Sequence, residues 1–321
     1  MTFVFLNKEA GLTIKKIAKF IYFFIPFKKY LFLLIKKFYT PNQSLYQHLA
    51  FKGEFKVQLE KSNFRLYHTG TLIENQLFWE GINGFEPNSL KIWIKLCRIS
   101  NVIFDLGSNT GVYSLIAKSE NPMSEVYAFE PVERVYEILQ KNLLINSFDV
   151  NSYKEAISSK DGMGMFYDDQ EEHQTSVVLN LDRSNEEGLH KVEVKTVKLD
   201  TFIKKHNIHT IDLIKIDVET HEPEVMDGFK EYLSIYKPTM LIEVIRDNVA
   251  LSLHSQLSGL GYNYFYISDP IGGNDLDFSD SSDIYSKVDT FIGGKFGNYL
   301  VCRDDIAIKL NLSPSGLGSF S

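Results

Sequence analysis

The residues that point most directly to chemistry are the loop Asp105-Leu-Gly-Ser-Asn-Thr-Gly111 and the carboxylate Glu130, which follows Asp105 by 25 residues. Gly107 and Gly111 have no Cβ atom, so the backbone can approach a ligand closely and the next helix can begin beneath it. Glu130 can accept both hydrogen bonds from a ribose 2′,3′-diol. Together these residues predict a binding site for a nucleoside ligand.

The same loop argues against a dinucleotide ligand. A dinucleotide loop reads Gly-x-Gly-x-x-Gly and receives a pyrophosphate, whereas Ser108-Asn-Thr110 stands in place of the middle glycine here. The carboxylate of Asp105 would repel a pyrophosphate but would suit an ammonium group. We therefore place Asp105 and Asn109 in the nucleoside site and keep a dinucleotide-dependent oxidoreductase as the enzymatic alternative. A loop-capping role for Asp105 and a solvated strand end for Glu130 stay open.

A second polar cluster consists of Asp217, Glu219, His221 and Glu222, and Glu243 lies near the end of a later apolar run. Removing a proton from a hydroxyl group requires a histidine, or a carboxylate of raised pKa, held in line with the reacting atoms. We predict that His221 is this base, because an ordinary histidine pKa near 6.5 leaves the ring mostly neutral at pH 7. Asp217 and Glu219 would orient the reacting ligands.

Two other interpretations of this cluster stay open. Glu219 and Glu222 would favour the N-terminus of a following helix through its dipole, which would leave His221 as an ordinary loop residue. The same carboxylates, together with Glu243, would also suit a hard divalent cation. We assign no metal ligand.

Apolar runs alternate with helical segments from residue 102 onward, which predicts an α/β fold with a doubly wound, mostly parallel sheet covered by helices on both faces. A ligand binds such a sheet beyond the carboxyl ends of its strands, where the polar residues above are found. Predicted strands cover residues 102–106, 126–130, 153–157, 213–217, 239–244, 262–267 and 299–302. Predicted helices cover residues 112–119, 132–145, 222–234 and 248–260, and an inserted hairpin or edge strand includes residues 192–197. Ala156, near the end of the third strand, is included in the cofactor site.

The chain divides into four segments: a basic and aromatic leader, an accessory layer, the main domain and a tail. Their ranges are 1–45, 46–100, 101–305 and 306–321. In the accessory layer we predict a hairpin over residues 55–67 and a helix over residues 88–97 with Asn88 as its N-cap. Cys97 and Cys302 have no Cys or His neighbour at metal-ligand spacing, which indicates neither a disulfide framework nor a zinc site and favours a reducing compartment.

The net charge of −7 is unevenly distributed. Residues 1–40 contain eight Lys and one Glu, so the remainder of the chain carries a net charge of −14. An acidic body lacks the basic face that nucleic acid requires, and we therefore expect no nucleic-acid partner.

The leader is too interrupted by charge to cross a bilayer. Its longest charge-free run, residues 20–27, is far below the ~20 residues that a spanning helix needs. Lys pairs also divide the apolar stretch, unlike in a signal peptide, so we expect a cytoplasmic protein. Aromatic residues interleaved with Lys would suit a helix lying on the anionic inner face of the membrane, a peripheral contact through residues 1–40. A helical hairpin packed on the main domain fits the leader equally well.

Taken together, the motifs resemble those of the FkbM family of class I methyltransferases, from about Glu86 to Cys302. The matching segments are 102–114, Ala128-Phe-Glu-Pro131, Leu199-Asp200, Ile214-Lys-Ile-Asp-Val-Glu-Thr-His-Glu222 and Asn298-Tyr-Leu-Val-Cys302. The resemblance implies S-adenosylmethionine as methyl donor and a seven-stranded sheet with one antiparallel strand. It also implies O-methylation, often of a sugar hydroxyl in a glycan, glycolipid or related metabolite, and allows Glu86 to reach the amino end of the cofactor.

One residue departs from the family pattern. Thr220 stands where the family usually has Gly in Asp-Val-Glu-Gly-His-Glu. A Thr there would alter the turn into the next helix and with it the acceptor geometry. A catalytically idle module that keeps the nucleoside site is therefore the non-enzymatic alternative.

Overall fold

The computed structural model describes residues 27–169, 189–270, 284–291, 295–312 and 317–318. Its centre is a nine-stranded sheet in the order β14-β12-β11-β13-β10-β9-β3-β4-β5. The strands are β3 (Val102–Leu106), β4 (Glu125–Phe129), β5 (Asn151–Tyr153), β9 (Leu213–Ile216), β10 (Thr239–Val244), β11 (Asn263–Ile267), β12 (Tyr285–Val288), β13 (Gly297–Cys302) and β14 (Leu317–Gly318). The run from β10 through β9, β3 and β4 to β5 is parallel, whereas β13 is antiparallel to both of its neighbours.

The seven strands from β5 to β11 confirm the expected sheet. Six of them run in one direction and β13 runs against them, because β13 is inserted between β10 and β11. Two further antiparallel strands, β12 and β14, extend the sheet beyond β11. The strand predicted last in the sequence therefore lies in the interior of the sheet and not at its edge. Sequence order alone does not reveal this position.

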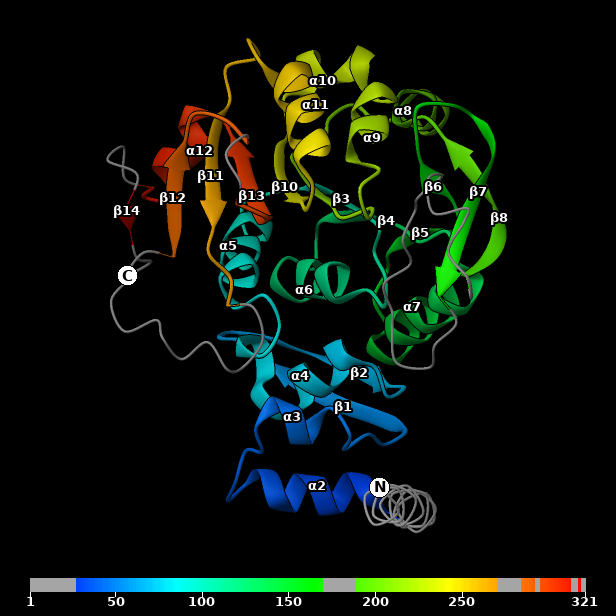
Figure 1. The fold of residues 1–321 in the computed structure, drawn as a ribbon, viewed down its shortest axis with the longest axis vertical. Coiled ribbons are helices and arrows are strands. Elements are labelled where there is room, and N and C mark those ends of the chain that lie inside the picture. Colours follow the sequence, from blue (N-terminus) through cyan, green and yellow to red (C-terminus); the bar gives the residue numbers. More distant parts are fainter. Residues whose placement is uncertain (1–26, 170–188, 271–283, 292–294, 313–316, 319–321) are drawn as a thin grey trace, which may run out of the picture.

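Helices cover both faces of the sheet (Figure 1). On one face lie α5 (Pro87–Cys97), α6 (Val112–Glu120) and α7 (Glu133–Asn146), and on the other α8 (Leu199–His206), α9 (Glu222–Asp227), α10 (Lys230–Tyr236) and α11 (Asp247–Leu257). Each face has its own hydrophobic core, because neighbouring strand residues point to opposite sides. Ile103 and Leu213 lie in the first core, and Phe104 and Ile214 lie in the second. Helix α12 (Asp304–Lys309) follows β13.

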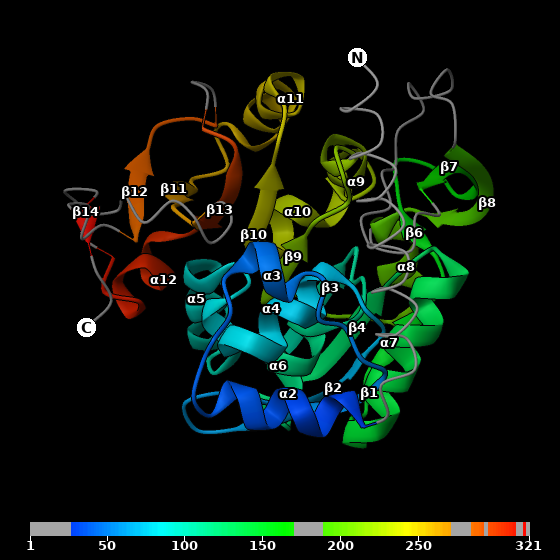
Figure 2. The ribbon, with the colours of Figure 1, turned by 60° about the horizontal axis from the view of Figure 1, so that its bottom comes forward.

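The accessory layer extends the first core away from the sheet. It contains the predicted hairpin, formed by β1 (Gly53–Gln58) and β2 (Asn63–His68), together with α2 (Lys28–Lys36), α3 (Gln43–Tyr46), α4 (Leu72–Glu80) and the turn η1 (Gly81–Asn83). Figure 2 brings this layer to the front, and Figure 1 shows α2 at the end of the molecule farthest from the sheet. No helix of the described residues is long and apolar enough to cross a membrane.

Two predicted elements are each divided in the structure. The strand predicted over residues 153–157 is β5, in the main sheet, followed by β6 (Ala156–Ile157), which joins β7 (Gly162–Asp169) and β8 (Leu189–Val197) in a separate three-stranded sheet. The inserted hairpin predicted around residues 192–197 is thus confirmed as β7 and β8. The helix predicted over residues 222–234 is divided into α9 and α10 near Gly228, where a Cβ atom would lie 2.1 Å from the Ser158 carbonyl oxygen.

The prediction of Asn88 as a helix cap was wrong. Helix α5 begins at Pro87 with Glu86 as its N-cap residue. The Asn88 backbone N–H donates to Asp269 Oδ1 at 2.7 Å, so Asn88 is bonded to the loop after β11 instead. Pro is favoured at the first helical position because its missing N–H would be unpaired there anyway, and this decides where α5 begins.

Candidate functional site

The polar residues singled out in the sequence lie along one edge of the sheet. Strand β3 has β4 on one side and β9 on the other. The chain therefore adds strands on one side of β3 first and returns later to add strands on its other side. This reversal is the switch point where α/β sheets bind ligands, beyond the carboxyl ends of the strands. The loop after β3, the end of β4 and the loop after β9 meet here.

The loop after β3 has the backbone that its glycines predict. Gly107 and Gly111 adopt φ of 79° and 94°, which side-chain-bearing residues rarely adopt. The Gly107 and Ser108 N–H groups both donate to the Phe129 carbonyl oxygen, which ties the loop to β4. A Cβ atom at Gly107 would lie 1.8 Å from the Asp217 carbonyl oxygen. The loop after β3 therefore packs directly against the backbone that leaves β9.

Asp105 lies beneath this loop and is 1% exposed. Its Oδ2 accepts a hydrogen bond from Ser114 Oγ at 2.6 Å. Burial, reinforced by the charge of Asp217, raises the pKa of Asp105 to about 6 although the Ser114 bond and Lys215 oppose the rise. The Ser114 bond joins Asp105 to α6 and does not test the loop-capping interpretation, and the contact with a ligand ammonium group stays a prediction.

Glu130 holds the far side of the loop. Its two oxygens accept the backbone N–H groups of Asn109 at 3.0 Å and Val132 at 2.9 Å. The side chain is buried, and burial raises the pKa of Glu130 to about 7. A carboxylate has about four acceptor positions, so these two bonds leave room for ribose hydroxyls. Asn109 itself has φ of 50°, a left-handed conformation that Asn tolerates better than most residues.

Glu86 reaches the same edge of the sheet from the start of α5. Its backbone is left-handed, with φ of 38°, and the Tyr113 hydroxyl donates to its carboxylate. Asp269, in the loop after β11, fixes this end of α5 by accepting the N–H groups of Asn88 and Ser89. Burial raises the pKa of Glu86 to about 6.

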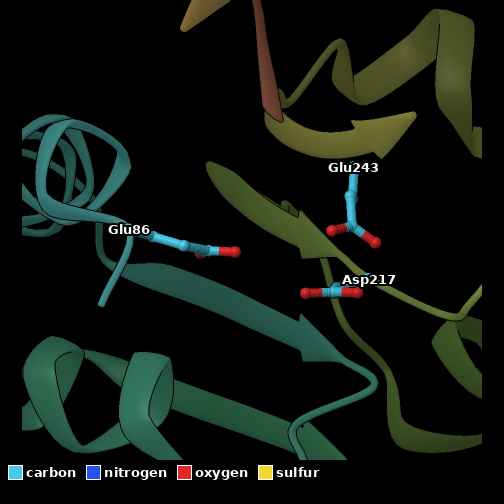
Figure 3. Close-up of side chains that lie close together, drawn as sticks. All are labelled: Glu86, Asp217 and Glu243. Carbon is cyan, nitrogen blue, oxygen red and sulfur yellow. The ribbon is translucent and has the colours of Figure 1, made fainter. Parts of the chain in front are cut away.

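Glu86, Asp217 and Glu243 form a carboxylate cluster, with one oxygen of each within 4.8 Å of the others. Figure 3 shows the three side chains pointing toward one another from separate elements. The ammonium group of Lys215, which is 1% exposed, donates to Asp217 Oδ2 at 3.1 Å and to Asn298 Oδ1 at 3.2 Å. Burial alone would lower the pKa of Lys215, but the surrounding carboxylates raise it, so Lys215 is charged.

Lys215 and Tyr113 were missed in the sequence. The signal for Lys215 is its position in the otherwise apolar run Leu213-Ile-Lys-Ile216, since a buried lysine requires charged or polar partners. Tyr113 offers no comparable signal, because a tyrosine in the first turn of an amphipathic helix is ordinary. Its role becomes visible only when its hydroxyl is seen to bond Glu86.

His221 lies on the same loop as Asp217 but has different partners. Its Nε2 lies 3.0 Å from Ser158 Oγ, and its Nδ1 lies 3.5 Å from Glu224 Oε2. Burial lowers the pKa of His221, although the charge of Glu224 opposes this. The ring is therefore neutral at pH 7, as a general base requires. The side chain is 13% exposed.

The loop between β9 and α9 is held from within by Glu222. This side chain is fully buried, and its Oε1 accepts the N–H groups of Val218 at 3.3 Å and Thr220 at 3.2 Å. Glu219 and Thr220 both have positive φ, 55° and 78°. The left-handed conformation costs a residue with a side chain about 1–2 kcal/mol, which explains why glycine suits the position of Thr220.

Ala156 lies apart from the main sheet. It is in β6, pairs with Thr196 of β8, and is buried with Val194 in a small core. Its place in the cofactor site stays a prediction that these contacts do not test.

The charges of the site suit a cation. Asp105 and the three carboxylates of the cluster surround Lys215, so ionised carboxyl groups would outnumber this ammonium group. A pyrophosphate would be repelled here, whereas a ligand with positive charge beside its nucleoside would be attracted. S-adenosylmethionine has that distribution of charge, and the residues present therefore fit it better than a dinucleotide.

Residues 105–264 match the family described as the methyltransferase FkbM domain. Methyltransferase sdnD of Sordaria araneosa is 28% identical over 156 residues, which cover 40% of this chain and 60% of that protein. Hexuronic acid methyltransferase AglP of Haloferax volcanii is 25% identical over 154 residues, covering 46% of this chain and 58% of that protein. The 31-O-demethyl-FK506 methyltransferase FkbM of Streptomyces tacrolimicus is 28% identical over 160 residues, covering 42% of this chain and 61% of that protein. The chain thus spans about three fifths of the length of these relatives.

Proposed function

Residues 105–264 are an FkbM methyltransferase domain, and on this premise we propose that the chain transfers a methyl group from S-adenosylmethionine to a hydroxyl group of a sugar. The observation that carries the proposal is the contact between the loop after β3 and the backbone of Asp217. It brings a nucleoside-binding loop and a cluster of ionisable side chains to one edge of the sheet. A methyltransferase needs both at that place.

The cofactor would be held by residues from three strand ends. Gly107, Asn109 and Gly111 form the loop against which its nucleoside lies, and Glu130 accepts the ribose hydroxyls. Glu86 receives the amino end. When bound, S-adenosylmethionine supplies an electrophilic methyl group on a positively charged sulfur.

The acceptor hydroxyl must lose a proton as it is methylated. We assign this proton to His221, because the ring is neutral and the Ser158 and Glu224 contacts hold its orientation. Asp217 and Glu219 would position the acceptor and the cofactor. A positioned base of this kind contributes about 10²- to 10⁴-fold to a rate.

A sugar acceptor is supported by the relative named as a hexuronic acid methyltransferase and by the usual acceptors of the family that the motifs resemble. The test is transfer of labelled methyl from S-adenosylmethionine to a panel of nucleotide sugars and lipid-linked oligosaccharides. We expect label in at least one sugar and none with Glu130→Ala, while Glu133→Ala, an exposed carboxylate on α7, remains active. Label in small amines but in no hydroxyl compound would contradict the proposal.

A catalytically idle module is the second candidate, and Thr220 favours it, because its strained backbone lies in the acceptor loop. Such a module would bind S-adenosylmethionine without methylating any acceptor. Restoring transfer with Thr220→Gly would show that the site is intact and that Thr220 alone suppresses it.

We also propose that the protein lies at the cytoplasmic face of a membrane through its leader. Helix α2 docks on the accessory layer through Phe32, whose ring lies against Phe51 and Trp79, with Ile35 packed against the same core and Lys36 bonded to the Phe78 carbonyl oxygen. Most of its other large apolar residues are exposed, as are the aromatic residues beside it. They are Phe27, Tyr30, Leu31, Leu33, Leu34, Phe38 and Tyr39. The lysines at both ends of α2 would attract an anionic lipid surface. The two interpretations of the leader, packed helix and membrane contact, are then compatible for α2, and residues 1–26 lie outside the described residues.

A further inference from the structure

We propose that Glu86, Asp217 and Glu243 bind the sulfonium cation of the methyl donor, and that Glu243 releases a proton when this cation arrives. The inference rests on the proposed function and deepens it. It assigns a role to Glu243 and Lys215, and it makes binding of the methyl donor a proton-coupled event.

The cluster is partly accessible from solvent. Glu86, Asp217 and Glu243 are each half-buried, and their oxygens lie within 4.8 Å of one another. Lys215 is fully buried and approaches from within, bonded to Asp217 and Asn298. The internal ammonium group therefore neutralises the inner side of the cluster, and the accessible side keeps an excess of carboxylate.

The cluster also lies where the sulfur of the cofactor is expected. In S-adenosylmethionine the sulfur joins the nucleoside to the amino-acid part. The loop that would receive the nucleoside contacts Asp217 directly through Gly107. Glu86, which would receive the amino end, is a member of the cluster. A sulfur between these two ends lies next to all three carboxylates.

The charges that act on Glu243 come from several elements. Asp217 and Glu219 follow β9, Glu86 precedes α5, and Lys215 within β9 is the cation among them. The charge of Asp217 is the largest influence, followed by burial, and together they raise the pKa of Glu243 well above its ordinary value. Burial and the neighbouring carboxylates therefore favour the protonated form of Glu243 in the free protein.

The other described groups that contact or act on the cluster are a hydroxyl, an amide and two carboxyl groups. Tyr113 of α6 donates its hydroxyl to Glu86, and Asn298 of β13 pairs with Glu243 across the sheet. Asp269 and Asp105 are carboxylates, and both act on neighbouring members of the cluster. An arriving cation is then the change that favours ionised Glu243, since a nearby opposite charge stabilises the charged form of a carboxyl group.

Two consequences follow for ligand binding. Binding of S-adenosylmethionine releases a proton, so its affinity increases as the pH rises toward the value at which Glu243 ionises unaided. S-adenosylhomocysteine has a neutral sulfur and should release fewer protons on binding to the same residues. The cluster therefore distinguishes methyl donor from product by charge.

The test is calorimetric titration of the full chain with each of the two ligands at pH 7, in two buffers that differ in ionisation enthalpy. The number of protons released is the slope of the apparent binding enthalpy against the buffer enthalpy. We expect more protons released with S-adenosylmethionine than with S-adenosylhomocysteine. Glu243→Gln should abolish the difference and lower the affinity ratio of the two ligands by about tenfold, the factor that one pKa unit represents.

The control is Glu231→Gln, which removes an exposed carboxylate that pairs with Lys204 of α8, and it should leave both proton counts unchanged. Equal proton release by the two ligands in the unaltered protein would overturn the inference, and this comparison needs no variant to fold. If neither ligand binds the folded protein, it is the proposed function that fails. If both bind and release equal numbers of protons, the function stands and the inference alone is wrong.

Discussion

Gly107 and Asp217 are in such close contact that a Cβ atom on the glycine would lie 1.8 Å from the aspartate carbonyl oxygen. The oxygen belongs to backbone and cannot rotate away, so an added side chain must displace the loop after β3 or the loop after β9. The two halves of the site are coupled here, and the Asp217 N–H also donates to the Leu106 carbonyl oxygen at 3.0 Å.

Gly107→Ala should therefore destabilise the protein and abolish binding of S-adenosylmethionine. Gly261→Ala is the matched control, because Gly261 has nearly the same φ, 78° against 79°, but open space around its Cβ position. The strain of positive φ, about 1–2 kcal/mol, is common to both variants. Thermal denaturation and calorimetric titration measure the difference. Equal losses of stability would mean that the contact with Asp217 contributes nothing.

Thr220→Gly should stabilise the protein by up to about 1 kcal/mol, because glycine adopts φ of 78° without strain but loses more chain entropy on folding. Thr210→Gly is the control and should be destabilising, because Thr210 does not have a positive φ. Chemical denaturation of both variants distinguishes them. A loss of stability in Thr220→Gly as large as that in the control would show that the backbone of this loop is not strained.

Glu222 makes the stability of the protein depend on pH. Burial raises its pKa from an ordinary 4.5 to about 7, so the folded state binds its proton more tightly than the unfolded state does. The free energy of unfolding should then decrease as the pH rises from about 4.5 to about 7. Glu222→Gln removes this dependence while keeping an acceptor oxygen, and should be more stable than the unaltered protein at pH 8 by roughly 3 kcal/mol. Denaturation of both proteins at pH 5 and pH 8 is the measurement. A difference in stability between variant and unaltered protein that is the same at both pH values would show that the pKa of Glu222 is not raised.

His221→Ala should leave the affinity for S-adenosylmethionine nearly unchanged and lower turnover by about 10²- to 10⁴-fold. Because burial lowers the pKa of His221, the neutral ring persists below pH 6.5, and turnover should decline only on the acid side of that value. His209→Ala, at an exposed position, is the control. Near-normal turnover of His221→Ala on an identified acceptor would move the role of base to Asp217 or Glu219.

The double variant Leu34→Ser and Phe38→Ser should weaken binding to anionic vesicles without loss of the fold, because both side chains are exposed and Phe32 keeps α2 docked. Vesicle sedimentation at low and high salt measures the binding, which should be weaker at high salt. Leu144→Ser changes an exposed leucine on α7 and should have no effect. Unchanged sedimentation of the double variant would remove α2 from any membrane contact.

Local sequence was sufficient for most of the main domain. Hydrophobic periodicity and the glycines at element ends predict the strands and helices, and both are properties of neighbouring residues. The sequence also predicted the nucleoside-binding loop for the same reason. Its residues are Asp105, Gly107 and Gly111, followed by Glu130. The division of the strand predicted over residues 153–157 was not predicted, because Tyr153 and Ile157 lie in the same hydrophobic core and no local signal shows that they pair with different strands.

The sequence by itself determined the class of fold, the nucleoside-binding loop and the supply of carboxylates, because each depends on residues a few positions apart. Only the tertiary structure decided which carboxylates meet. Glu86 lies more than a hundred residues before Asp217 and Glu243 in the chain. The three meet only because β9 lies between β3 and β10 and α5 begins beside them. It also decided that Lys215 lies beneath the cluster and that His221 contacts Ser158. Electrostatic interaction depends on distance in space, and distance in space is set by the order in which strands pair.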